Sequence, residues 1–136
     1  TNKKYDKIYI MLGVNEMGYR FDKIIEKYKE LLSFIKQKQP DTTIFLQANL
    51  HVTGERSNSD DTFNNHSINK LNKALSKMAD NKKIYYLDVN PIFDDENGNL
   101  SADKSEDNTH LYAKYYEVWG KWIVSQSASL TKEELH

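Results

Sequence analysis

The sequence predicts a three-layer α/β domain in which a parallel β-sheet is covered by helices on both faces. Three short apolar segments support this prediction: residues 7–12 (KIYIML), 43–50 (TIFLQANL) and 83–89 (KIYYLDV). Each is nearly continuously hydrophobic and rich in β-branched and aromatic residues, which is typical of strands covered on both faces. Helical patterns alternate with these segments, and such alternation indicates a parallel sheet with right-handed crossovers.

Three amphipathic helices are expected between and after these strands. Residues 20–40 (RFDKIIEKYKELLSFIKQKQP) place apolar side chains on one face at helical spacing, and Pro40 ends the pattern. Residues 63–79 (FNNHSINKLNKALSKMA) repeat such a face, and the last helix carries apolar residues from Leu111 to Ile123. The predicted order is therefore β-α-β-α-β-α, in a single domain over residues 1–136.

The composition of the chain narrows the functional classes. The chain has 136 residues and a formal net charge of -1, with 19 basic and 20 acidic residues mixed along its length. This balance gives no indication of a nucleic-acid-binding face or a polybasic membrane anchor. No apolar segment approaches the roughly 20 residues that cross a bilayer. Because the chain has no cysteine, disulfides, thiolate nucleophiles and thiolate metal ligands are excluded, while the compartment stays open.

Three polar clusters follow the predicted strands. Residues 12–16 (LGVNE) leave the first strand, residues 48–51 (ANLH) leave the second, and residues 107–110 (DNTH) close the loop after the third. Because the carboxyl ends of parallel strands lie at one edge of a sheet, the clusters are expected together, where open α/β sheets place their sites. The long polar connections at residues 51–62 and 90–109 leave the same edge and are expected to be irregular, functional loops.

Two of these clusters contain groups suited to catalysis: one has an acid–base pair, and the other has a neutral hydrogen-bond donor. Asp107 and His110 are three residues apart, so in a helix-like turn the carboxylate can accept the Nδ1 proton of the imidazole. Nε2 is then free to take a proton from a nucleophile. The amide of Asn15 follows Gly13, which permits a tight turn, and it is suited to donate a hydrogen bond to an oxyanion.

The sequence offers few other candidate binding residues. Asn49 and His51 follow the second strand and, with Gly13, are the candidate substrate-binding residues. No serine stands at a strand end beside glycine, so no nucleophile is evident. The histidines lack metal-ligand spacing. Residues 93–104 fail the calcium-loop template, because its first and last positions fall on Phe93 and Lys104, so no metal is expected.

Simpler interpretations exist for each candidate catalytic residue. Asp107 is also compatible with a helix N-cap, since Asp is common at that position. His110 is compatible with a half-buried histidine at a helix start. Asn15 is compatible with a turn residue after Gly13, because asparagine tolerates left-handed backbone conformations. These alternatives stay open at the level of sequence.

The polar clusters resemble the conserved blocks of the SGNH hydrolases, also called the GDSL-type esterase and lipase family. Residues 13–16 (GVNE) look like the family's third block, usually Gly-x-Asn-Asp, although Glu16 stands where Asp is more usual. Residues 107–111 (DNTHL) look like its fifth block, Asp-x-x-His. The resemblance implies a flavodoxin-like α/β/α fold, Asn15 as an oxyanion donor, Asp107 as the orienting carboxylate and His110 as the base.

The resemblance also implies that part of the family's machinery is missing here. The first block (Gly-Asp-Ser, with the nucleophile) and the second (a glycine donor) precede the third, whereas only 12 residues precede Gly13. The chain is therefore expected to be a carboxyl-terminal part of the domain and inactive alone. The family's first strand would lie beside residues 7–12, which leaves an exposed edge for an amino-terminal segment or another chain.

The function implied by the resemblance is serine ester hydrolysis without a cofactor. The substrates expected are small acyl or acetyl esters, including O-acetylated carbohydrates and short-chain lipids, and the reaction proceeds through a covalent acyl-enzyme. The alternative is a non-catalytic module that binds a carbohydrate or another small ligand at the same sheet edge.

Overall fold

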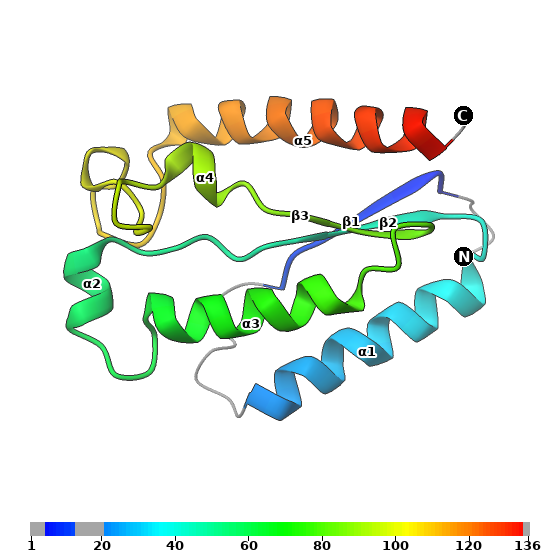
Figure 1. Ribbon diagram of the computed structural model, residues 1–136, viewed down its shortest axis with the longest axis horizontal. Coiled ribbons are helices and arrows are strands. Elements are labelled where there is room, and N and C mark those ends of the chain that lie inside the picture. Colours follow the sequence, from blue (N-terminus) through cyan, green and yellow to red (C-terminus); the bar gives the residue numbers. More distant parts are fainter. Residues whose placement is uncertain (1–4, 13–20, 135–136) are drawn as a thin grey trace.

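The computed structural model describes residues 5–12 and 21–134 and has three layers (Figure 1). A parallel sheet lies in the middle, with helices α1 (Phe21–Lys38) and α3 (Asn65–Met78) on one side and helix α5 (Ala113–Glu134) on the other. The predicted three-layer α/β fold is confirmed. In the part of the chain that the structure describes, no helix has both the length and the apolar character needed to cross a membrane.

The sheet has three parallel strands in the order β1-β2-β3. They are β1 (Lys7–Ile10), β2 (Thr43–Gln47) and β3 (Ile84–Leu87). Each strand starts at or next to the predicted residue but ends two or three residues earlier. The segments beyond the strand ends leave the ladder, which brings their polar side chains to one edge of the sheet.

Alternation along β2 divides the core between the two faces of the sheet. Ile44 and Leu46 pack in the cluster that includes the buried residues of α1 and α3. Phe45 points the opposite way and packs with residues of α5. Its ring stacks between those of Tyr9 and Tyr85, with centroid distances of 5.1 and 5.6 Å. This central strand is buried on both faces, as its apolar sequence predicts.

Strand β1 lies at the exposed edge expected from the family resemblance and is less buried than β2 and β3. Only Ile10 in this strand is buried, and Tyr9 is 39% exposed. The reason is position: among the described residues β1 pairs with β2 alone and forms an edge of the sheet.

The two long polar connections are more ordered than the sequence predicts. The first contains helix α2 (Gly54–Asn58), which begins after Thr53, whose hydroxyl accepts a hydrogen bond from the Arg56 N–H. The second contains helix α4 (Asn90–Phe93) and a 3-10 turn at Ala102–Lys104. The Thr53 cap stabilises α2 and the proline in the first turn stabilises α4, and apolar periodicity reveals neither.

Candidate active site

The loop before α5 holds Asp107 and His110 together. Nδ1 of His110 lies 2.7 Å from Oδ2 of Asp107. Because an ionised carboxylate only accepts hydrogen bonds, this contact places the ring proton on Nδ1 and leaves Nε2 as the basic nitrogen. The His110 side chain is 69% exposed and that of Asp107 is 55% exposed, so a reacting group can approach the ring.

The second oxygen of the Asp107 carboxylate organises the loop backbone. Oδ1 accepts hydrogen bonds from the N–H groups of Thr109 (2.9 Å) and His110 (2.7 Å) and from the Ser105 hydroxyl (3.1 Å). The His110 N–H, followed by the His110 ring and the Thr109 N–H, lowers the pKa of Asp107 well below its usual range. The carboxylate therefore stays ionised near neutral pH, as a partner for an imidazolium must. It closes this turn and does not cap α5, which begins at Ala113.

His110 borders a shallow hollow on the surface. The hollow is lined by Glu106, Asp107, His110, Leu111, Tyr112 and Ala113. Tyr112 is 40% exposed, so an aromatic ring and an imidazole border the same space. Such a hollow offers both apolar contact and hydrogen bonds to a small polar ligand.

Asn49 is buried beneath the same sheet edge. It is only 1% exposed, and its Nδ2 donates to Oδ1 of Asn72 at 3.4 Å. Its Oδ1 is buried and has no hydrogen-bond partner among the described residues. This oxygen is therefore an acceptor that a donor from elsewhere can satisfy.

His51 is also buried, with both ring nitrogens next to oxygen atoms. Nδ1 lies 2.9 Å from Oδ2 of Asp94, and Nε2 lies 2.6 Å from Oδ1 of Asn69. Burial lowers the pKa of His51, but the hydrogen bonds to Asp94 and Asn69 and the charges of Asp94 and Asp88 outweigh it and raise the pKa. Two acceptors favour the imidazolium, so His51 links the segment after β2 to α3 and to the residue after α4.

The other two predicted site residues, Gly13 and Asn15, lie outside the described residues. The described chain stops just before them at Leu12, whose N–H donates to the hydroxyl of Tyr28 at 3.2 Å. This contact ties the end of the first strand segment to α1.

Three asparagines that the sequence analysis passed over hold the segment after β2. Asn72 accepts from the Asn49 N–H at 2.8 Å and donates to the Asn49 carbonyl at 3.0 Å. Asn65 pairs with the N–H and carbonyl of Val52 in the same way, at 2.8 and 2.7 Å. Asn90 accepts from the His51 N–H at 2.9 Å and donates to the Asn49 carbonyl at 3.0 Å. These amides take the place of a neighbouring strand.

A signal for part of this network exists in the sequence. Asn65, Asn69 and Asn72 are spaced four and three residues apart, so they share one face of α3. Asn65 and Asn72 are buried, and Asn69 is exposed but reaches the His51 ring through its Oδ1. Asparagines beside the apolar face of a helix indicate amides with specific partners, because unpaired buried amides are costly.

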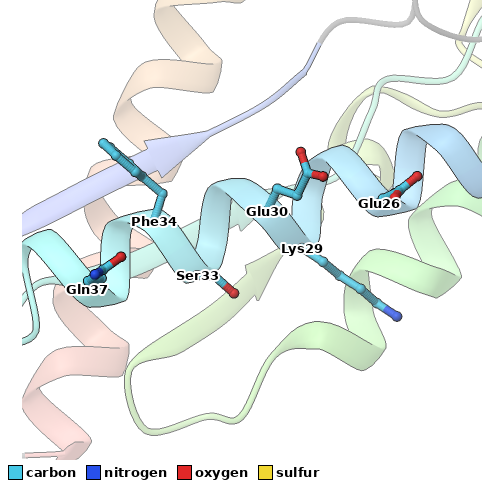
Figure 2. Close-up of a pocket in the computed structure, with 6 residues that line it drawn as sticks. All are labelled: Glu26, Lys29, Glu30, Ser33, Phe34 and Gln37. Atoms are coloured by element: carbon cyan, nitrogen blue, oxygen red, sulfur yellow. The ribbon is translucent and has the colours of Figure 1, made fainter.

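A second hollow lies on the outer surface of α1 (Figure 2). It is lined by Glu26, Lys29, Glu30, Ser33, Phe34 and Gln37, all from this one helix. Phe34 is 58% exposed. The hollow contains no histidine, and its residues make no carboxylate–imidazole pair like that of Asp107 and His110. Within the described residues, no group of three or more acidic or histidine side chains is arranged to hold a metal ion.

Comparison with known families identifies the domain. The model of the GDSL-like lipase/acylhydrolase family matches residues 1–118, a range that includes Asp107 and His110. The chain belongs to this family. The match agrees with the SGNH resemblance of the polar clusters and covers most of the α/β domain.

Two solved structures share the fold of this chain. A proposed platelet activating factor from Streptococcus pneumoniae superposes with a TM-score of 0.76 at 22% identity, over 92% of this chain and 59% of that one. A proposed acylhydrolase from Bacteroides fragilis superposes with a TM-score of 0.71 at 18% identity, over 95% of this chain and 62% of that one. This GDSL-like chain therefore spans about three-fifths of the length of these structures.

One local sequence match lies outside the family. A glutamyl-tRNA reductase from Clostridium beijerinckii is 38% identical over 47 residues, which are 35% of this chain and 12% of that protein. A match of this extent does not bear on the GDSL-like domain as a whole.

Proposed function

We propose that this GDSL-like domain belongs to a serine ester hydrolase in which His110 is the general base and Asp107 orients it. The observation that carries the proposal is the 2.7 Å contact between Nδ1 of His110 and Oδ2 of Asp107, on an imidazole that is largely exposed. The contact fixes the tautomer and stabilises the imidazolium that forms when Nε2 takes a proton.

The proposed reaction is acyl transfer through a covalent intermediate. A serine hydroxyl attacks the ester carbonyl carbon and its proton passes to Nε2 of His110, while the Asn15 amide donates to the oxyanion. The tetrahedral intermediate collapses, the carbon–oxygen ester bond breaks, and His110 returns the proton to the leaving alcohol. Water then attacks the acyl-serine by the same route and releases the acid.

The nucleophilic serine is proposed to come from a segment outside residues 1–136. Ser105 is the serine closest to the pair along the chain, but its hydroxyl donates to Asp107 rather than to His110. It is also buried, at 6% exposed. The additional length of the solved relatives is consistent with a further segment that carries the nucleophile.

The same segment, or another chain, is proposed to pair along residues 7–12. The Thr43 N–H donates to the Asp6 carbonyl at 3.0 Å, so Asp6 faces β2. Because hydrogen-bonding direction alternates along a strand, Lys7 and Tyr9 direct their backbone groups away from β2. An unpaired edge of this kind is a template for another strand.

Small acyl or acetyl esters, O-acetylated carbohydrates included, are the proposed substrates. The hollow at His110 has charged residues (Glu106 and Asp107) and apolar ones (Leu111 and Ala113) in its lining, which suits a small ester with a polar part. Gly13, Asn49 and His51 remain proposed substrate-binding residues. The unpartnered Oδ1 of Asn49 is an acceptor on a buried side chain, and the buried contacts of His51 favour indirect support of the site.

The decisive experiment substitutes the base in the complete protein. His110→Ala is expected to lower kcat for p-nitrophenyl acetate by at least about 1000-fold, because the serine loses its proton acceptor. His66→Ala is the matched control, since His66 is an exposed histidine on α3, and it is expected to keep full activity. Circular dichroism checks that both variants fold.

A fluorophosphonate probe separates the enzyme from a binding module. The complete protein is expected to be labelled at a serine outside residues 1–136, and the chain of residues 1–136 alone is expected to stay unlabelled. Labelling of a serine within residues 1–136 contradicts the proposed origin of the nucleophile. Full activity in His110→Ala contradicts the proposed base.

A further inference from the structure

Asn108 has an unusual backbone conformation between the two members of the proposed catalytic pair. Its φ is 66°, in the left-handed region that β-branched side chains avoid and that asparagine and glycine tolerate. Asp107 precedes it, and the Thr109 and His110 N–H groups that follow it both donate to Oδ1 of Asp107. The left-handed residue therefore lies inside the turn that folds the chain back over the carboxylate.

The carbonyl group of Asn108 is anchored to a different part of the sheet edge. The Thr53 N–H donates to it at 3.0 Å, and Thr53 is 2% exposed. The preceding residue, Val52, is held on both backbone groups by Asn65 and also accepts from the Leu100 N–H at 3.0 Å. The anchor is thus a buried segment with hydrogen-bonded backbone groups. Among the described residues, the hydrogen bond from the Thr53 N–H to the Asn108 carbonyl connects it to the catalytic turn.

We propose that Asn108 is a positioning residue: its left-handed conformation, locked by the Thr53 N–H, sets the distance between Asp107 and the His110 ring. A residue that cannot hold this φ has to open the turn, which moves the His110 N–H and Nδ1 away from the carboxylate. The ring then loses its fixed tautomer, and Nε2 is no longer held as the basic nitrogen. A displacement of about 1 Å at such a group can cost on the order of 100-fold in rate.

The expected effect on kcat rests on the proposed function, whereas the expected effects on the His110 tautomer and the Thr53 hydrogen bond do not. The matched pair is Asn108→Gly and Asn108→Val: both remove the amide side chain, and only valine disfavours the left-handed region. The first readout is the ¹⁵N shifts of the neutral His110 ring in the complete protein, which report the share of the Nδ1–H tautomer. The second is hydrogen exchange at the Thr53 amide.

We expect Asn108→Gly to retain the wild-type tautomer, Thr53 protection and kcat within about 3-fold. Asn108→Val is expected to lose the Nδ1–H preference, to expose the Thr53 amide and to lower kcat by about 10-fold or more, with KM changed less than about 3-fold. If valine prevents folding, Asn108→Ala replaces it, because alanine meets the same backbone restriction with a smaller side chain.

The outcomes distinguish this inference from the proposed function. Equal behaviour of the glycine and valine variants in both spectroscopic readouts overturns the positioning role, whether both match the wild type or both differ from it. A tautomer change in Asn108→Val, together with full activity in His110→Ala, supports the positioning role and contradicts the function.

Discussion

His51 and His110 each face an aspartate, but the surroundings of the second ring nitrogen differ. Nε2 of His51 is occupied by Asn69 on a side chain that is 10% exposed, whereas the side chain of His110 is 69% exposed. A base needs a nitrogen that its substrate can reach, so only His110 meets the requirement for proton transfer. His51 is better suited to hold three segments together as an imidazolium.

The protonation of His51 has a testable effect on stability. Its pKa is raised above 6.5 in the folded state, so its contribution to stability is full below about pH 6.5 and is lost as pH rises through the folded pKa. NMR titration of the ring is expected to give a midpoint above 6.5, and Asp94→Asn is expected to lower that midpoint. A wild-type midpoint at or below 6.5 contradicts the assigned contacts.

Side-chain pairs could be predicted from the sequence where the two residues are close together along the chain. The Asp107–His110 pairing was predictable because three residues in a turn bring the side chains within reach. The His51–Asp94 pair was not, since the two residues are 43 positions apart and only the folded chain brings them together. The roles predicted for Gly13 and Asn15 stay predictions.

At the scale of elements, the segment after β2 is held by side chains instead of a strand. Three asparagine amides satisfy backbone groups from residue 49 to residue 52, and the same segment supplies the Thr53 anchor. Hydrophobic patterns locate β2 well, but they predicted a strand that continues to Leu50. The strand ends at Gln47 because, after that residue, asparagine side chains and not a neighbouring strand pair with the backbone. A periodic pattern of apolar residues contains no information about such side chains.

The amide of Asn72 provides a direct test of this arrangement. Asn72→Ala is expected to lower the free energy of unfolding by about 2 kcal/mol or more, because it leaves the buried Asn49 N–H without its acceptor. Lys73→Ala, at an exposed position on the same helix, is expected to change it by less than about 0.5 kcal/mol. Urea unfolding followed by circular dichroism measures both. Equal effects of the two substitutions would show that the amide is dispensable.

For the whole molecule, chain order and sheet topology determine which residues meet. Alternating strands and helices predicted the three-layer fold, and parallel strands predicted that polar clusters at strand ends gather at one edge. The exposed edge at β1 was predicted from the family resemblance and not from the strand's own residues, which are as apolar as those of the central strand. The difference comes from what lies beside the strand, and an edge strand in one chain is a central strand once another segment pairs with it.

No strand in the described part of the chain pairs with the outer edge of β1, and this leads to a prediction about association. The chain of residues 1–136 has a mass of 15.9 kDa, and sedimentation velocity is expected to reveal a larger species formed through β1. Lys7→Pro removes a backbone N–H that points away from β2 and is expected to weaken association, whereas Lys7→Ala keeps that N–H and is expected to leave association unchanged. A monomeric wild-type chain, with no co-purifying fragment in the mass spectrum, contradicts strand pairing at this edge.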